Sequence, residues 1–159
     1  MSGYTIRKIS ELATEYGDDF VHNVVSQLCA GYFTLAVKPL QIPAAALSST
    51  QRKRIERFSK LDQQSSSYTV AAYLIAQFGK NYQAGNGSIS GAELLSFAMN
   101  HIRRAQEEVG GQIVFLEMEH GNSKLAAFYG KCGFKQFGER NTVENGKPIT
   151  YDQLFLFLK

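Results

Sequence analysis

The pattern of apolar and polar positions changes several times along the chain, and each change marks a predicted element. Apolar and β-branched residues follow one another over 31–38 and, almost without interruption, over 68–78, which favours two strands. We expect the first strand to stop at Pro39, because proline cannot donate to a strand ladder. Shorter apolar runs predict the remaining strands, which cover 113–118, 134–137 and 151–158, the last two on either side of a turn containing Gly146.

Helical spacing of apolar residues occurs after the strands at 68–78 and 113–118. Ser90 and Glu93 match the capping box S-x-x-E, which predicts a helix start, and Gly110-Gly111 predicts its end. A second helix is predicted over 122–131, closed by Gly133 in a position that needs a left-handed residue. The apolar face of the first helix is expected to comprise Leu94, Leu95, Ala98, Ile102, Ala105 and Val109.

The rest of the chain gives weaker signals. Residues 43–67 are predicted to form a connection with one short polar helix over 50–60. Residues 4–9 suit a strand, and 21–28 favour a helix, although their β-branched residues also allow a strand. The order strand–helix–strand–helix–strand–strand predicts an α/β (α+β) fold, in a single domain over 1–159, with a mixed central sheet and helices on both faces.

Composition narrows the classes of protein. A chain of 159 residues with 44% hydrophobic and 19% charged residues suits one folded domain and excludes an intrinsically disordered chain. No apolar run reaches the ~18–20 residues of a membrane-spanning helix, and the N-terminus lacks the pattern of a secretion signal. Cys29 and Cys132 are too few for a disulfide framework, and neither lies in a zinc-binding pattern. We therefore expect a cytoplasmic protein with no membrane partner and no metal.

Basic residues gather in one stretch, although the formal net charge is only +3. Such a stretch can bind phosphates or an acidic partner, or it can be the solvated face of a helix. The sequence leaves both interpretations open. The residues are Arg52, Lys53, Arg54, Arg57 and Lys60, opposed only by Glu56.

Residues 122–134, with the sequence NSKLAAFYGKCGF, resemble the motif N-x-x-A-x-x-F-Y-x-x-x-G-F of the GCN5-related N-acetyltransferases, the GNAT superfamily. Ala126 lies one place from the usual alanine of the motif. The segment from 77–79 to 91–95 is similar to the acetyl-CoA motif of the same family, R/Q-G-x-G-I/L-G-x-x-L-L, although only Gly87 and Gly91 of its glycines are kept. The residues that match the first motif directly are Asn122, Phe128, Tyr129, Gly133 and Phe134.

This resemblance covers roughly 68–159, which would be the acetyl-CoA-binding half, while 1–30 would be a shortened or diverged acceptor-side region. It implies acetyl-CoA as the acyl donor, with its diphosphate held by backbone N–H groups at a helix start, where the helix dipole also favours an anion. Glu93 adds a negative charge at this helix end, which Lys80 would offset by reaching a phosphate. The cofactor-binding residues implied are Phe78, Gly79, Lys80, Gly87, Ser88, Ile89, Ser90, Gly91 and Asn122.

The same resemblance implies that Tyr129 protonates the leaving thiolate as general acid. Packing of a Phe128–Tyr129 pair onto the sheet is the alternative explanation of that residue. Glu117 is the candidate general base for the acceptor amine, with Glu119 as an alternative, and both also suit a solvated strand end. For Asn122 a helix N-cap is an equally open role.

The segment GYFTLA at 31–36 is similar to a strand of toxin-type acetyltransferases, some of which modify aminoacyl-tRNA. The resemblance therefore implies direct transfer of acetyl from acetyl-CoA to a primary amine of a small molecule, a peptide or an aminoacyl-tRNA, without a metal. A non-catalytic acyl-CoA-binding or partner-binding module stays open as the alternative. A homodimer and an antitoxin-like protein partner also stay open.

Overall fold

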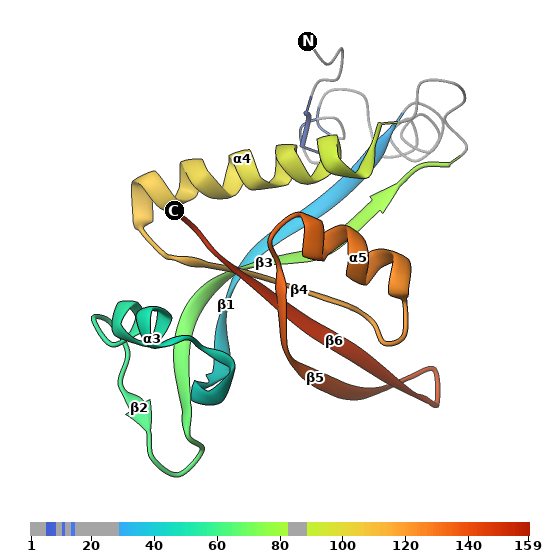
Figure 1. Ribbon diagram of the computed structural model, residues 1–159. Coiled ribbons are helices and arrows are strands. Elements are labelled where there is room, and N and C mark those ends of the chain that lie inside the picture. Colours follow the sequence, from blue (N-terminus) through green and yellow to red (C-terminus); the bar gives the residue numbers. More distant parts are fainter. Residues whose placement is uncertain (1–5, 9–10, 12–13, 15–28, 83–88) are drawn as a thin grey trace. The chain divides into compact units, whose positions relative to one another are not determined.

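The computed structural model describes residues 6–8, 11, 14, 29–82 and 89–159, and its strands form a six-stranded mixed sheet (Figure 1). The sheet order is β1-β3-β4-β6-β5, with β2 paired to β3, and β3 runs parallel to β4 while β6 is antiparallel to both β4 and β5. This confirms the predicted mixed α/β class. The elements are β1 (Gly31–Pro43), η1 (Ala44–Ala46), α3 (Ser49–Ile55), β2 (Leu61–Asp62), β3 (Ser67–Lys80), α4 (Gly91–Val109), β4 (Ile113–Glu119), α5 (Ser123–Lys131), β5 (Lys135–Glu144) and β6 (Lys147–Phe157).

Three strand predictions were wrong in their extent. The first strand does not stop at Pro39 but continues to Pro43, because β1 lies at the edge of the sheet, where a residue without an N–H is tolerated. The strands β5 and β6 are also longer than predicted, and they form a hairpin closed by Asn145 and Gly146. Both residues have positive φ, 51° and 76°, as a two-residue type I′ turn requires.

The predictions for the described helices hold, with two corrections. The Ser90–Glu93 capping box is present at the start of α4, and Gly110 and Gly111 follow its end with φ of 79° and 100°. Val109, however, is 77% exposed, so it does not belong to the buried face of α4, whereas Met99 is buried there and was not predicted. The short helix α3 covers Ser49–Ile55, so it begins one residue before the predicted range of 50–60 and ends five residues short of it.

The chain divides into two compact units, which are described separately below. The first comprises 1–34 and 77–101, and the second comprises 35–76 and 102–159. The predicted helix over 21–28 lies outside the described residues, as do residues 4, 5 and 9 of the predicted strand over 4–9, and its described residues 6–8 form no strand. The single-domain organisation stays a prediction. Among the described residues, none of the helices combines the length and apolar character needed to cross a membrane.

The strand β4 carries one apolar layer on each side in the second unit. Ile113 and Phe115 belong to a buried cluster that includes Ile55 of α3. Phe155 of β6, directly opposite Phe115 in the register, completes this layer. The first face of the sheet is therefore the one that α3 covers, and the side chain of Glu117 lies on it because alternate residues of a strand share a face.

The opposite face of β4 is covered by α5. Val114 and Leu116 lie there, and Val114 is directly opposite Leu156 of β6. A Cβ added to Gly133, just after α5, would come within 3.3 Å of Leu156 Cδ1. Helices thus cover both faces of this part of the sheet, as predicted (Figure 1).

Candidate active site

The helix α5 presents the residues of the 122–134 motif in the second unit. Asn122 is its N-cap, and its side-chain oxygen accepts a hydrogen bond of 3.1 Å from the backbone N–H of Leu125. At the other end Gly133 has φ of 91°, and Phe134 N donates to Tyr129 O at 3.0 Å. The predicted N-cap role of Asn122 and the left-handed role of Gly133 are thus confirmed.

Tyr129 is the buried side chain of α5, with 5% of its surface exposed. Its ring centroid lies 5.1 Å from that of Phe128 and 5.8 Å from that of Phe134, the latter in an edge-on arrangement. Burial raises the pKa of the Tyr129 phenol above its ordinary value, and nearby Cys132 adds to the rise. The phenol therefore stays protonated at neutral pH, as a proton donor must, and it also packs the helix onto the sheet.

The parallel ladder between β3 and β4 is short. Its last pair is Ile75 with Leu116, and Ala76 and Glu117, the next residues along the two strands, are not ladder partners. On its other side β4 remains paired with β6 as far as Glu119. The edge of β4 beyond Leu116 therefore has no β3 partner within the described strands. An extended ligand that carries amide groups can pair with such a strand edge.

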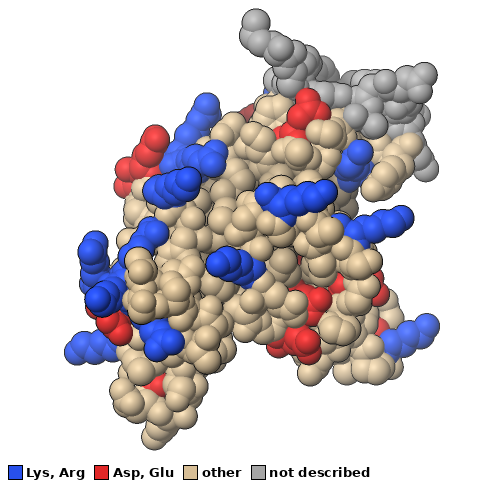
Figure 2. All heavy atoms as spheres, viewed as in Figure 1, with Lys and Arg blue, Asp and Glu red and all other residues tan. Residues whose placement is uncertain are grey.

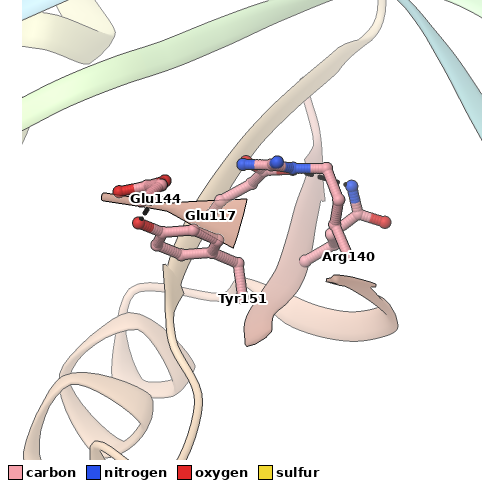
Figure 3. A network of polar contacts seen from close by, with 5 residues as sticks. Glu117, Arg140, Glu144 and Tyr151 are labelled. Carbon is pink, nitrogen blue, oxygen red and sulfur yellow. Dashed lines mark hydrogen bonds and ion pairs between the residues drawn. The ribbon is translucent and has the colours of Figure 1, made fainter. Parts of the chain in front are cut away.

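Glu117, the candidate base, is held by two neighbours on the first face of the sheet (Figure 3). Arg140 of β5 donates to both carboxylate oxygens, with contacts of 2.7 to 2.9 Å, and Gln153 of β6 donates to Oε1 at 2.8 Å. Burial alone would raise the pKa of this carboxyl, but the hydrogen bonds from Arg140 and Gln153 and the charges of Arg140 and Lys38 bring it below its usual value. An acid with a lowered pKa is a weaker general base at neutral pH.

The network around Glu117 continues along the β5–β6 hairpin. The Arg140 guanidinium lies 5.0 Å from the centroid of the Tyr151 ring, and Tyr151 donates its hydroxyl proton to Glu144 at 2.9 Å (Figure 3). A bulge between Gln136 and Gly138 shifts the register by one residue, so that Arg140 lies opposite Tyr151 and on the face of Glu117. Sequence reasoning missed Arg140 and Gln153, because nothing in the sequence pattern located this bulge.

The start of α4 in the first unit is where the resemblance implies a diphosphate. Ser90 Oγ accepts a hydrogen bond from Glu93 N at 3.1 Å, while Ser90 N and Oγ donate to the Glu93 carboxylate at 3.0 and 2.8 Å. Hydrogen bonds from Ser90, the backbone one first, lower the pKa of Glu93. Of the four amides that a helix start leaves without helical partners, this box satisfies two, and the other two are those of Gly91 and Ala92.

Residues near the end of β3 in the first unit show why glycine is needed there. A Cβ on Gly79 would come within 2.8 Å of the Tyr32 ring, and one on Gly31 within 3.0 Å of the Gly79 carbonyl oxygen. The close approach of β1 and β3 thus accounts for Gly79 without a ligand. Lys80 lies with its ammonium 5.6 Å from the centroid of the Tyr82 ring.

The other predicted cofactor residues divide between described and undescribed parts of the chain. Ile89 is buried, with 3% of its surface exposed, whereas Gly87 and Ser88 lie outside the described residues. Phe78 is half-buried near the end of β3. Phe78, Gly79, Lys80, Ile89, Ser90 and Gly91 belong to the first unit, while Glu117, Asn122 and Tyr129 belong to the second.

The basic stretch is not uniformly a solvated face. Blue spheres gather over α3 in Figure 2, but Arg54 is half-buried. Its Nε donates to Gln112 Oε1 at 3.1 Å and its Nη2 to the carbonyl oxygen of Leu158 at 2.9 Å, and the guanidinium lies 5.0 Å from the Phe157 ring centroid. Arg54 therefore fastens α3 to the end of β6. The other members of the stretch, Arg52, Lys53, Arg57 and Lys60, are exposed, and Arg52 Nε donates to the carbonyl oxygen of Leu47 at 3.2 Å.

No protein-family model and no curated protein sequence matches the chain. Among solved structures, Arabidopsis thaliana NAA60 in complex with a bisubstrate analogue matches with a TM-score of 0.49 and 12% identity, over 81% of this chain and 65% of that one. The same protein in complex with acetyl-CoA matches with a TM-score of 0.49 and 14% identity, over 94% of this chain and 93% of that one. AtaT complexed with acetyl-methionyl-tRNAfMet matches with a TM-score of 0.48 and 23% identity, over 77% of this chain and 61% of that one.

These structures are GNAT acetyltransferases, the class whose motif residues 122–134 resemble. The chain spans 65% of the NAA60 chain that holds the bisubstrate analogue and 61% of the AtaT chain. Each TM-score lies below 0.5, so we draw the function from the residues of this chain and not from the superpositions.

Proposed function

We propose that this protein is an acetyl-CoA-dependent N-acetyltransferase that transfers the acetyl group directly to a primary amine. The observation that carries the proposal is the α5 helix. The proposal is supported by the local structure of this helix, in which Asn122 is the N-cap, Gly133 is left-handed and Tyr129 is buried with a raised pKa. The parallel β3–β4 ladder, which ends at Ile75 and Leu116, supports it by leaving a strand edge for the amide groups of pantetheine.

In this reaction the acceptor amine attacks the thioester carbonyl and the carbon–sulfur bond then breaks, releasing coenzyme A as a thiolate. Tyr129 would donate its phenolic proton to that sulfur. The ion pair with Arg140 makes Glu117 a weak base, so in our proposal its negative charge attracts the acceptor as an ammonium ion, and it takes the proton through water. The amides of Gly91 and Ala92 would bind the diphosphate, together with Gly87 and Ser88.

The substitution Tyr129→Phe tests this proposal, because it keeps the ring and removes only the proton donor. Turnover, measured as release of free thiol from acetyl-CoA with a panel of amines, should fall by about 10²–10⁴-fold. Acetyl-CoA binding, measured as thermal stabilisation, should change little. Tyr68→Phe is the matched control, since Tyr68 is also buried and donates to Glu56 at 2.8 Å. It should lose about 1 kcal/mol of stability and keep its turnover. Equal turnover of the two variants would contradict the acid role.

A non-catalytic acyl-CoA-binding module is the second candidate. It is favoured by the pairing of Glu117 with Arg140, since this ion pair lowers the reactivity expected of the candidate base. The two functions differ in one measurement. A binding module is stabilised by acetyl-CoA, by about 2.7 kcal/mol at 100 times its dissociation constant, but releases no thiol with any amine.

An aminoacyl-tRNA acceptor depends on the exposed basic residues near α3. Arg57→Glu combined with Lys60→Glu should reduce RNA binding and its salt dependence, while leaving stability nearly unchanged because these side chains are exposed. Arg54 must be left intact, because Arg54→Glu would break its hydrogen bonds to Gln112 and Leu158. An unchanged RNA affinity in the double variant would remove RNA from the acceptors.

A further inference from the structure

Three potential metal ligands come together on the α5 face of the sheet, in the second unit. Asp152 of β6 lies directly opposite Glu139 of β5 and Met118 of β4 in the register. His120 follows β4, and its backbone N–H donates to Thr150 O at 3.0 Å, which fixes its place beside β6. Each potential ligand is thus attached to backbone that the sheet holds in place.

The bulge in β5 is what brings Glu139 to this position. Without the one-residue shift between Gln136 and Gly138, the residue opposite Asp152 would be Gly138. The side chain of Glu139 would then fall on the other face of the sheet, because side chains alternate along a strand. The same bulge that places Arg140 on the face of Glu117 therefore also places Glu139 beside Asp152.

The distances in the cluster suit a small divalent ion. His120 Nδ1 lies 2.8 Å from Asp152 Oδ1 and 3.8 Å from Glu139 Oε1, and one ligand atom of each residue lies within 4.8 Å of the other two. Bonds of about 2.0–2.2 Å in tetrahedral geometry separate ligand atoms by about 3.3–3.6 Å. The exposed side chains of His120 and Glu139 can make the small adjustment needed, while Asp152 is buried and fixed.

We propose that His120, Glu139 and Asp152 form a binding site for a divalent transition-metal ion, with Zn²⁺ as the ion best suited. The ligands would be His120 Nδ1 and one oxygen from each carboxylate, and water would complete a tetrahedral shell. An imidazole ligand favours Zn²⁺ over Mg²⁺ and Ca²⁺, which prefer oxygen-only sites. Gln136 Nε2 donates to Asp152 Oδ1 at 3.0 Å and orients this carboxylate from the outer shell.

Charge supports the same assignment. Two carboxylates lie close together here, and the hydrogen bond and charge of Asp152, with the charge of Glu139, raise the pKa of His120. The cluster therefore attracts one positive charge, which a proton on His120 or a metal ion can supply. Binding of the metal at Nδ1 requires that nitrogen to be deprotonated, so an ion that binds there releases a proton. This site does not depend on the proposed acetyl transfer, which needs no metal.

Isothermal titration of the chelator-treated full chain with Zn²⁺ tests the proposal. We expect saturable binding of one ion per chain at pH 7.5, thermal stabilisation of the fold by Zn²⁺, and weaker binding at pH 5.5. His120→Gln and Glu139→Gln should each weaken binding by more than the 10–100-fold typical of outer-shell changes. His101→Gln is the matched control, because His101 lies on α4 in the first unit, and it should leave the affinity unchanged.

One further variant keeps the outcome unambiguous. Asp152 is buried, and the substitutions above are therefore made at the exposed His120 and Glu139. A chain with Cys29→Ser and Cys132→Ser should still bind Zn²⁺ with the affinity of the parent. Absence of saturable binding in the parent, unchanged affinity in His120→Gln, or loss of binding in the cysteine variant would each overturn the proposal.

Discussion

The two helices α4 and α5 begin with different caps, and the difference concerns what each helix start could do for an anion. At α5 the Asn122 side chain satisfies a single amide, that of Leu125, and no acidic residue lies in the first turn. At α4 a reciprocal box satisfies two amides and places the Glu93 carboxylate in the first turn. Both caps stabilise their helices, but only that of α4 brings negative charge to the helix end that is meant to bind an anion.

This contrast shows that one residue pattern can serve structure well and function poorly. The capping box is a strong helix start, and the ionised Glu93 gains from the dipole of α4. A bound diphosphate would gain from the same dipole and would be repelled by Glu93. At α5 nothing competes in this way, and Tyr129 near its other end keeps the protonated state that a proton donor needs. We therefore expect substitutions at the start of α4 to be the ones that can strengthen acetyl-CoA binding.

Among the variants that test this comparison, Gly87→Glu should change acetyl-CoA binding the most, because it adds a side chain and a negative charge to the predicted diphosphate loop. We expect the thermal stabilisation by acetyl-CoA to be lost, corresponding to at least a tenfold weaker affinity, because the diphosphate needs close approach to backbone N–H groups. Gly130→Glu on α5 is the matched control. It makes the same change in net charge at an exposed glycine whose added Cβ meets nothing within 4 Å.

The control should bind acetyl-CoA as the parent does. If Gly87→Glu stays folded and is stabilised by acetyl-CoA as strongly as Gly130→Glu, the diphosphate does not bind at the start of α4. The proposed function would then need another donor site.

Much of the fold could be predicted from the sequence because its central elements carry strong local signals. The strand at 113–118 is apolar except for Glu117, and the helices begin or end at the Ser90–Glu93 box, Asn122 and Gly133. The edge strands were harder to predict. β1 passes through Pro39, and the outer half of the β5–β6 hairpin is polar on both sides, so its alternation gives no signal of where pairing ends.

The residues of the candidate site likewise fall into those that local sequence could predict and those that it could not. Asn122 and Tyr129 could be found from a motif that is local in sequence. The partners of Glu117 could not, because Arg140 and Gln153 reach it through strand pairing and a bulge that tertiary structure decides. His120 gave no signal either, since its neighbours in space come from β5 and β6 and not from the adjacent sequence.

A smaller effect should distinguish the two caps in stability. Ser90→Ala and Asn122→Ala each remove a side chain that accepts a helix amide, and each should cost about 1 kcal/mol in the free energy of unfolding. Only Ser90→Ala should change the acid limb of the stability profile. The hydrogen bonds of Ser90 lower the pKa of Glu93, so their contribution is present above the ordinary glutamate pKa and is lost as the pH falls through the lowered value. Denaturant titrations between pH 3 and 7 measure both effects, and identical pH profiles for the two variants would contradict this assignment.

The smallest effect, and the most direct test of the comparison, is expected from Glu93→Gln. Glutamine can keep the reciprocal hydrogen bond of the box, so the substitution removes the charge and little else. Its stability should fall slightly, because a charge–dipole interaction at the helix end is lost. Acetyl-CoA affinity should rise about two- to fivefold, since the same charge no longer repels the diphosphate, and the gain should shrink at high salt because exposed charges are screened. Glu108→Gln, an exposed change near the other end of α4, alters the net charge equally and should leave the affinity unchanged. If both variants bind acetyl-CoA like the parent at low salt, the carboxylate of Glu93 does not face the diphosphate, and the contrast between the two helix starts has no consequence for binding.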